Sequence, residues 1–147
     1  MKKFTFSLQP LLDYRKRYED RLKKELAEIK KEEKRQKKII EQLHKKRTKC
    51  EEELRKRRIS GEIEIASLLI YQFYLDKLSL QIEEETKKME EIFLKIKNKQ
   101  TQIIEASKNK KVLEKLKEKR WLKFIDDVEK DEQRFIDEIA LTKFNSR

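Results

Sequence analysis

A single glycine and a single proline in 147 residues strongly limit what this chain can fold into. Tight turns and left-handed backbone conformations depend on these two residue types, so a chain with one of each changes direction rarely. The glycine, Gly61, stands in the run Arg58-Ile59-Ser60-Gly61-Glu62-Ile63, and a reversal of the chain is expected there. The chain should therefore consist of two long segments joined by one turn.

Apolar residues recur with a helical period in both segments. Before the turn, steps of four and three residues from Leu22 pass through apolar and polar positions: Leu22, Leu26, Ile29, Glu33, Gln36, Ile40, Leu43, Arg47, Cys50 and Leu54. After the turn, Leu68 stands one heptad before Leu75, and the same steps then pass through Leu75, Leu78, Ile82, Glu85, Met89, Ile92, Ile96, Lys99, Ile103, Ala106, Lys110 and Leu113. The composition, 47% charged and 36% hydrophobic, would also fit a disordered chain. The periodicity instead indicates the seam of a coiled coil.

The expected fold is all-α, a long two-helix antiparallel coiled-coil hairpin whose second helix is longer than the first. A single domain over 1–147 is expected, with helix 1 at about 8–58, the turn at about 59–64 and helix 2 at about 65–143. A turn near residue 60 places Leu43 beside Leu78 and Ile29 beside Ile92, and brings Leu8 near Leu113. On this pairing, residues beyond about 118 have no partner in the chain. This overhang carries an apolar stripe: Trp121, Phe124, Ile125, Val128, Phe135, Ile136 and Ile139.

The start of helix 1 suggests two local details. Pro10 is tolerated in a first helical turn, where backbone N–H groups lack partners, and Ser7 is expected to cap the helix. The apolar residues Leu11, Tyr18, Leu22 and Leu26 include two consecutive four-residue steps. Such a stutter is expected to relax the supercoil locally.

No enzyme chemistry is visible, so no catalytic residue, metal site or cofactor is expected. The only histidine, His44, lies almost two helical turns from the only cysteine, Cys50, which argues against a Cys–His pair. One glycine cannot build a phosphate-binding loop, and no cluster of metal ligands is present. No apolar run approaches the roughly 18 residues of a membrane span. We expect a protein of the cytoplasm, or one peripheral at a membrane.

The positive charge is concentrated before the turn. Residues 1–60 hold 22 Lys and Arg against 11 Asp and Glu, whereas residues 61–147 hold 18 of each. Basic runs such as Arg55-Lys56-Arg57-Arg58 leave open an alternative, a nucleic-acid-associated or purely structural coiled coil. Interleaved glutamates and the absence of stacking aromatics between residues 23 and 58 favour ion pairs on a helix surface instead. Nucleic acid is therefore not the expected partner.

Apolar residues just after the turn exceed what a single seam needs. They are Ile70, Tyr71, Phe73, Tyr74, Leu75, Leu78 and Leu80, and they cover more than one face of the second helix. Exposed apolar patches of this kind mark partner sites. A docking surface is expected here, and the alternative is a local cap that folds over the turn.

Three sequence stretches resemble the FliJ family, the small coiled-coil component of the bacterial flagellar type III export apparatus. The first is the opening Phe4-x-Phe6-x-Leu8-x-x-Leu11-Leu12-x-x-Arg15. The second is Tyr71-x-x-Tyr74-Leu75-x-x-Leu78-x-x-x-Ile82. The third is Leu113-x-x-Leu116-x-Glu118-Lys119-Arg120, followed by Glu132 and Glu138-x-Ala140. Their order and spacing around one turn carry the resemblance, which extends over nearly the whole chain.

The resemblance implies a stalk and adaptor between two partners, together with handling of export chaperones and their cargo. One partner is the hexameric export ATPase, the other the cytoplasmic domain of the membrane export gate. ATPase contacts are implied at Phe4, Phe6, Leu8, Leu11, Arg15, Trp121, Phe124 and Phe135. Gate contacts are implied at Tyr74, Leu78, Gln81 and Glu85. A stalk of the related virulence secretion systems remains open on the residues alone.

Overall fold

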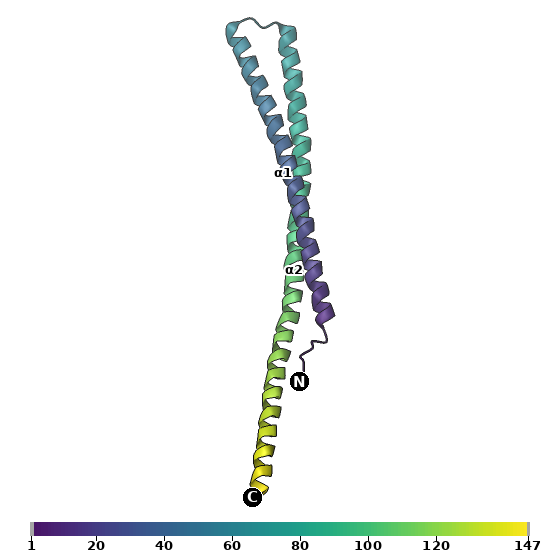
Figure 1. The fold of residues 1–147 in the computed structure, drawn as a ribbon. Helices are drawn as coiled ribbons and strands as arrows, with labels where there is room; N and C mark the ends of the chain where they lie inside the picture. Colours follow the sequence, from purple (N-terminus) through teal and green to yellow (C-terminus); the bar gives the residue numbers. More distant parts are fainter. Residues whose placement is uncertain (1, 147) are drawn as a thin grey trace. The chain divides into compact units, whose positions relative to one another are not determined.

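Two long helices make up nearly all of the computed structural model, which describes residues 2–146 (Figure 1). Helix α1 spans Gln9–Ser60 and helix α2 spans Ile65–Asn145, against expected bounds of about 8–58 and 65–143. The residues between them, 61–64, form the only link, and no strand occurs in the described residues. The all-α hairpin with a longer second helix is confirmed.

The turn depends on Gly61. Its φ angle is +70°, in the left-handed region that costs glycine little and other residues more. The Gly61 amide donates to the Arg58 carbonyl oxygen at 3.3 Å, and Ser60 Oγ donates to the Arg57 carbonyl oxygen at 3.0 Å. These bonds satisfy carbonyl groups that the end of α1 leaves without helical partners. The reversal thus occurs where the glycine predicted it.

The chain divides into two compact units, each built from a stretch of α1 and a stretch of α2. The turn unit is Leu22–Thr101, and the terminal unit combines Met1–Arg21 with Gln102–Arg147. In each unit the two stretches pack antiparallel. That the whole chain is one domain stays a prediction.

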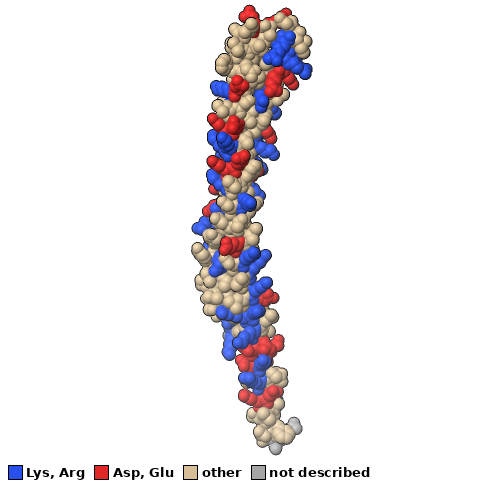
Figure 2. All heavy atoms as spheres, turned by 180° about the vertical axis from the view of Figure 1, so that it is seen from behind, with Lys and Arg blue, Asp and Glu red and all other residues tan. Residues whose placement is uncertain are grey.

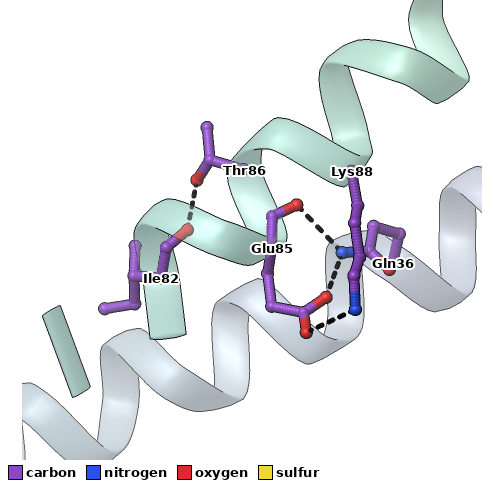
Figure 3. A network of polar contacts seen from close by, with 5 residues as sticks. All are labelled: Gln36, Ile82, Glu85, Thr86 and Lys88. Carbon is purple, nitrogen blue, oxygen red and sulfur yellow. Dashed lines mark hydrogen bonds and ion pairs between the residues drawn. The ribbon is translucent and has the colours of Figure 1, made fainter. Parts of the chain in front are cut away.

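In the turn unit the expected seam is confirmed. Every seam position predicted in α1 from Leu22 to Leu54 is buried or half-buried, including the polar ones. Gln36 Nε2 donates to Glu85 Oε2 at 2.5 Å and to the Glu85 carbonyl oxygen at 2.9 Å (Figure 3). These two bonds place Gln36 of α1 level with Glu85 of α2. One heptad along the antiparallel seam in either direction, Leu43 comes level with Leu78 and Ile29 with Ile92.

In the terminal unit the seam continues without the expected stutter. Leu12 is 1% exposed and Leu11 is 39% exposed, so Leu12 rather than Leu11 occupies the seam. The next slots hold polar residues, Arg15 and Glu19, and Glu19 Oε2 pairs with Lys110 Nζ at 2.8 Å. The stutter was inferred from apolar residues alone, and charged side chains in the seam keep the four–three repeat intact. Leu8 packs against Leu12 and Leu113, as expected.

The overhang begins later than residue 118 because residues 2–8 run along α2 instead of extending α1. We call this segment the N-terminal strap. Its Phe4 ring lies 5.2 Å from the Trp121 ring and 5.6 Å from the Phe124 ring, and Lys2 Nζ lies 3.5 Å from Asp131 Oδ2. The prediction that residues 119–131 lack a partner in the chain is therefore wrong. An irregular segment covers more length per residue than a helix, so a few residues reach far along α2.

The strap also changes the role of Ser7. The first helical hydrogen bond runs from the Leu12 amide to the Leu8 carbonyl oxygen, so Leu8 occupies the N-cap position. Ser7 Oγ instead accepts a hydrogen bond from Arg120 Nη1 at 2.9 Å. The same guanidinium lies over the Phe6 ring, 5.4 Å from its centroid. Ser7 thus ties the strap to α2, and the expectation that it caps α1 is wrong.

Candidate functional site

Most of the residues implied as ATPase contacts meet in the terminal unit. Phe4, Phe124 and Trp121 form an aromatic cluster, in which the Trp121 and Phe124 rings stack with centroids 5.9 Å apart. Phe6 is buried with Leu12 and Leu113, and Leu8 packs against the same core. Aromatic pairs at these distances are worth about 0.5–1.5 kcal/mol each beyond the burial of their area. The start of the chain and the stretch of α2 from Leu113 to Phe124 are thereby joined in one patch.

The remaining three residues of this set lie apart from the aromatic cluster. Leu11 is exposed on the outer side of α1. Arg15 is half-buried in the seam, where its Nε atom has no hydrogen-bond partner among the described residues. Phe135 is 63% exposed, in the stretch of α2 beyond the strap where every described residue from 131 onward is exposed. That stretch presents further large apolar side chains: Ile136, Ile139, Leu141 and Phe144.

A groove of about 560 Å³ adjoins the aromatic cluster. Its floor is apolar, formed by Phe124, Ile125 and Val128, and its rim is acidic. The lining residues are Lys2, Phe124, Ile125, Val128, Glu129, Asp131 and Glu132. Lys2 is the one residue of this lining that comes from the strap, and sequence reasoning missed it. The sequence feature that could have predicted this contact is the basic pair at the start of the chain, whose charge is opposite to that of the acidic residues that follow Ile125.

The residues implied as gate contacts divide between surface and seam. Tyr74 is exposed and Gln81 is half-buried. Leu78 is 3% exposed in the seam, and Glu85 is bound to Gln36 of α1 and to Lys88, whose Nζ lies 3.3 Å from Glu85 Oε1 (Figure 3). Hydrogen bonding from Gln36 first, and the nearby Lys88, lower the pKa of Glu85. Leu78 and Glu85 thus join the two helices.

An open groove of about 410 Å³ lies beside Tyr74 in the turn unit. Residues of both helices line it: Lys46, Lys49, Cys50, Glu53, Ile70, Tyr71 and Tyr74. Burial raises the pKa of the Cys50 thiol, and the neighbouring Glu53 and Glu51 act in the same direction. Sequence reasoning missed Lys46, Lys49 and Glu53, although pairing about a turn near residue 60 places them opposite Ile70 and Tyr74.

The apolar surplus after the turn is exposed, as expected of a docking surface. Ile70, Phe73 and Leu80 all lie open to solvent. Tyr71 is half-buried, with Arg57 over its ring at 5.3 Å from the centroid, and Leu75 and Leu78 lie half-buried and buried in the seam. The seam therefore leaves most of this surface uncovered.

Charge and composition of the surface give little support to other classes of site. On the face drawn in Figure 2, basic and acidic side chains are interleaved, without one continuous basic surface. Between residues 2 and 146 no three His, Cys, Asp or Glu side chains are grouped to hold a metal ion. Neither described helix contains a stretch long and apolar enough to cross a membrane.

Comparison with known proteins identifies a family. The model of the FliJ family, described as Flagellar FliJ protein, matches residues 4–147. No curated protein and no solved structure matches the chain. The matched range contains both helices, the turn, and all but the first residues of the strap. The chain therefore belongs to the FliJ family and is a non-enzymatic component of flagellar protein export.

Proposed function

We propose that this protein is a stalk and adaptor that links the hexameric export ATPase to the cytoplasmic domain of the membrane export gate. The terminal unit binds the ATPase, and the turn unit binds the gate. The single observation that supports this most directly is the pair of separate exposed apolar surfaces, one in each unit. A hairpin that served only as a structural rod would leave neither surface uncovered.

The ATPase-binding surface lies on the terminal unit. Trp121, Phe124 and Phe135 of α2 make the principal contacts, with Leu11 and Arg15 of α1 at the side. Phe6 and Leu8 act indirectly, because Phe6 is buried in the core that holds the strap and Leu8 packs against that core. Burying one large apolar side chain is worth about 1.5–3 kcal/mol, so a few of them are enough for micromolar binding after the entropic costs.

The gate-binding surface lies on the turn unit, with Tyr74 as its central contact and Gln81 beside it. Leu78 and Glu85 keep α1 and α2 together beneath these side chains and hold Tyr74 in place. In this role the protein assists the handling of chaperone–substrate complexes and is peripheral to the cytoplasmic face of the membrane, held there through the export apparatus.

Replacing Phe135 by alanine tests the ATPase surface. Phe135 is exposed, so the substitution should leave the helix content unchanged while weakening binding to the purified hexameric export ATPase roughly tenfold. Phe93→Ala is the matched control, because Phe93 is also an exposed phenylalanine of α2 but lies in the turn unit. Equal affinity of both variants, measured by titration calorimetry, would remove the α2 stripe from ATPase binding.

Replacing Tyr74 by alanine tests the gate surface in the same way. We expect roughly tenfold weaker binding to the purified cytoplasmic domain of the export gate, with unchanged circular dichroism. Phe93→Ala again serves as the control. If Tyr74→Ala binds like the wild type, the gate contact lies elsewhere, and if its helical signal falls, Tyr74 is a structural residue.

A further inference from the structure

The strap covers part of the surface to which we assign ATPase binding. Phe4 lies edge-on against Trp121 and tilted against Phe124, so its ring occupies the apolar face that these two side chains would offer a partner. Beyond Phe4, Lys2 pairs with Asp131 at the rim of the acidic groove. The chain's own first residues thereby occupy part of the apolar stripe and one carboxylate of its acidic rim.

The contacts that hold the strap are side-chain contacts. Among the described residues no backbone hydrogen bond joins residues 2–8 to α2. The Lys2 and Asp131 side chains are 77% and 53% exposed, and an ion pair in that setting contributes little. Trp121 stays 44% exposed beneath Phe4. Phe6 is buried and anchors the strap, so the part that opens at low free-energy cost is residues 2–5.

The covered surface continues past the end of the strap. The groove formed by Phe124, Ile125 and Val128 is open, and the exposed apolar residues from Phe135 follow on the same helix. Removal of Phe4 would join Trp121 and Phe124 to this open part. The strap therefore divides one long apolar stripe into a covered part and an open part.

We propose that residues 2–5 are an autoinhibitory cover, which competes with the export ATPase for the Trp121–Phe124 face of α2 and must lift, with Phe6 staying in the core, before the ATPase binds there. This inference rests on the proposed function. A partner's apparent affinity falls with the fraction of molecules in which its site is open. Phe4 therefore lowers the affinity for the ATPase, although it belongs to the aromatic cluster, whereas Trp121 and Phe135 raise it.

The first measurement follows the strap without any partner. Trp121 is the only tryptophan, so its emission reports on this site alone. In full-length Phe4→Ala we expect a red-shifted emission maximum and stronger quenching by acrylamide, with wild-type helicity. Adding a synthetic peptide of residues 2–9 to this variant should reverse the shift. Phe93→Ala should behave as the wild type. Unchanged Trp121 emission in Phe4→Ala would show that the strap does not cover Trp121 in solution.

The second measurement is the affinity for the purified hexameric export ATPase. Because two aromatic contacts close the strap, Phe4→Ala should bind about fivefold more tightly than the wild type. The peptide of residues 2–9 should weaken that binding. Unchanged or reduced affinity together with the expected Trp121 shift would overturn the competition and make Phe4 a direct contact or a bystander. A failure of Phe135→Ala to weaken binding overturns the proposed function separately.

Discussion

The turn unit and the terminal unit use the same two helices and the same four–three repeat, yet different interactions hold them together. In the turn unit the buried seam positions are mostly aliphatic, and the helices are joined by the Gln36–Glu85 hydrogen bond and the partly exposed Glu25–Lys99 ion pair. In the terminal unit the seam contains a charged pair, Glu19 with Lys110, and an aromatic strap wraps its outer end. Periodicity alone describes the first unit well and the second poorly.

This difference shows which parts of a coiled coil can present a binding surface. A regular seam leaves the outer helix faces free, so the turn unit presents Phe73 and Tyr74 without strain on its packing. In the terminal unit α2 extends beyond the start of α1, so its residues there can pack only against segments other than α1. The strap supplies one for residues up to Asp131, and the stretch beyond it stays uncovered.

The largest expected effect is on the turn unit. Leu78→Ala removes a side chain that is buried in the seam, and this should lower the free energy of unfolding by about 2–5 kcal/mol. Leu80→Ala, two residues away and exposed, should change it by less than about 0.5 kcal/mol. Urea unfolding followed by circular dichroism measures both. Equal effects would mean that the seam does not hold this unit together.

The next effect concerns the charged pair of the terminal unit. Lys110→Met deprives the Glu19 carboxylate, which is 5% exposed, of its ammonium partner, and should cost about 1–3 kcal/mol. That is below the cost for a fully buried pair because the Lys110 side chain is 23% exposed. Adding Glu19→Leu should recover most of the loss, since an apolar seam needs no ion pair. If Lys110→Met unfolds like the wild type, this pair lies on the surface in solution.

A smaller effect on the free energy of unfolding is expected from the Gln36–Glu85 hydrogen bond of the turn unit, and this effect should depend on pH. Gln36 holds the pKa of Glu85 below its ordinary value of 4.5, so the ionised carboxylate favours the folded state. This stabilisation is complete above pH 4.5 and is lost as the pH falls through the lowered pKa of the folded state. Gln36→Ala should therefore be less stable than the wild type by about 1 kcal/mol at pH 7, with a smaller difference at pH 3. A difference independent of pH would assign the loss to packing.

The Glu19–Lys110 ion pair of the terminal unit should lose its stabilising effect at high pH rather than at low pH. The hydrogen bond from Lys110 to Glu19, and then the charge of Glu19, raise the pKa of Lys110 above 10.5. Its stabilising effect is present below pH 10.5 and is lost as the pH rises through the raised pKa. The wild type should thus lose more stability above pH 10.5 than Lys110→Met, in the same urea titrations.

The smallest effect is expected at the strap's ion pair. Lys2→Ala removes an exposed contact and should change the free energy of unfolding by less than about 0.5 kcal/mol. Thermal unfolding at low and high salt measures it. A loss well above 1 kcal/mol would mean that the strap is a structural part of the terminal unit, which would contradict its role as a cover that lifts.

Most of the fold could be predicted from sequence because a coiled-coil seam is a local pattern repeated many times. The seam residues from Leu22 to Leu113 follow from steps of four and three, and the turn follows from Gly61. The candidate site was harder to predict. Leu78 matches the family pattern for a gate contact, but it also occupies a seam slot, and only the paired helix shows that it is buried.

Sequence by itself determined the helices, their order, the turn and the register of the turn unit, because each depends on residues close together or on one repeated period. Tertiary structure alone decided three other features: the charged slots at Arg15 and Glu19, the Ser7–Arg120 bond, and the strap across Trp121 and Phe124. The physical reason is the large separation of these residues along the sequence. Phe4 meets Trp121 across more than a hundred residues of sequence, and no helical period encodes where an irregular segment lies.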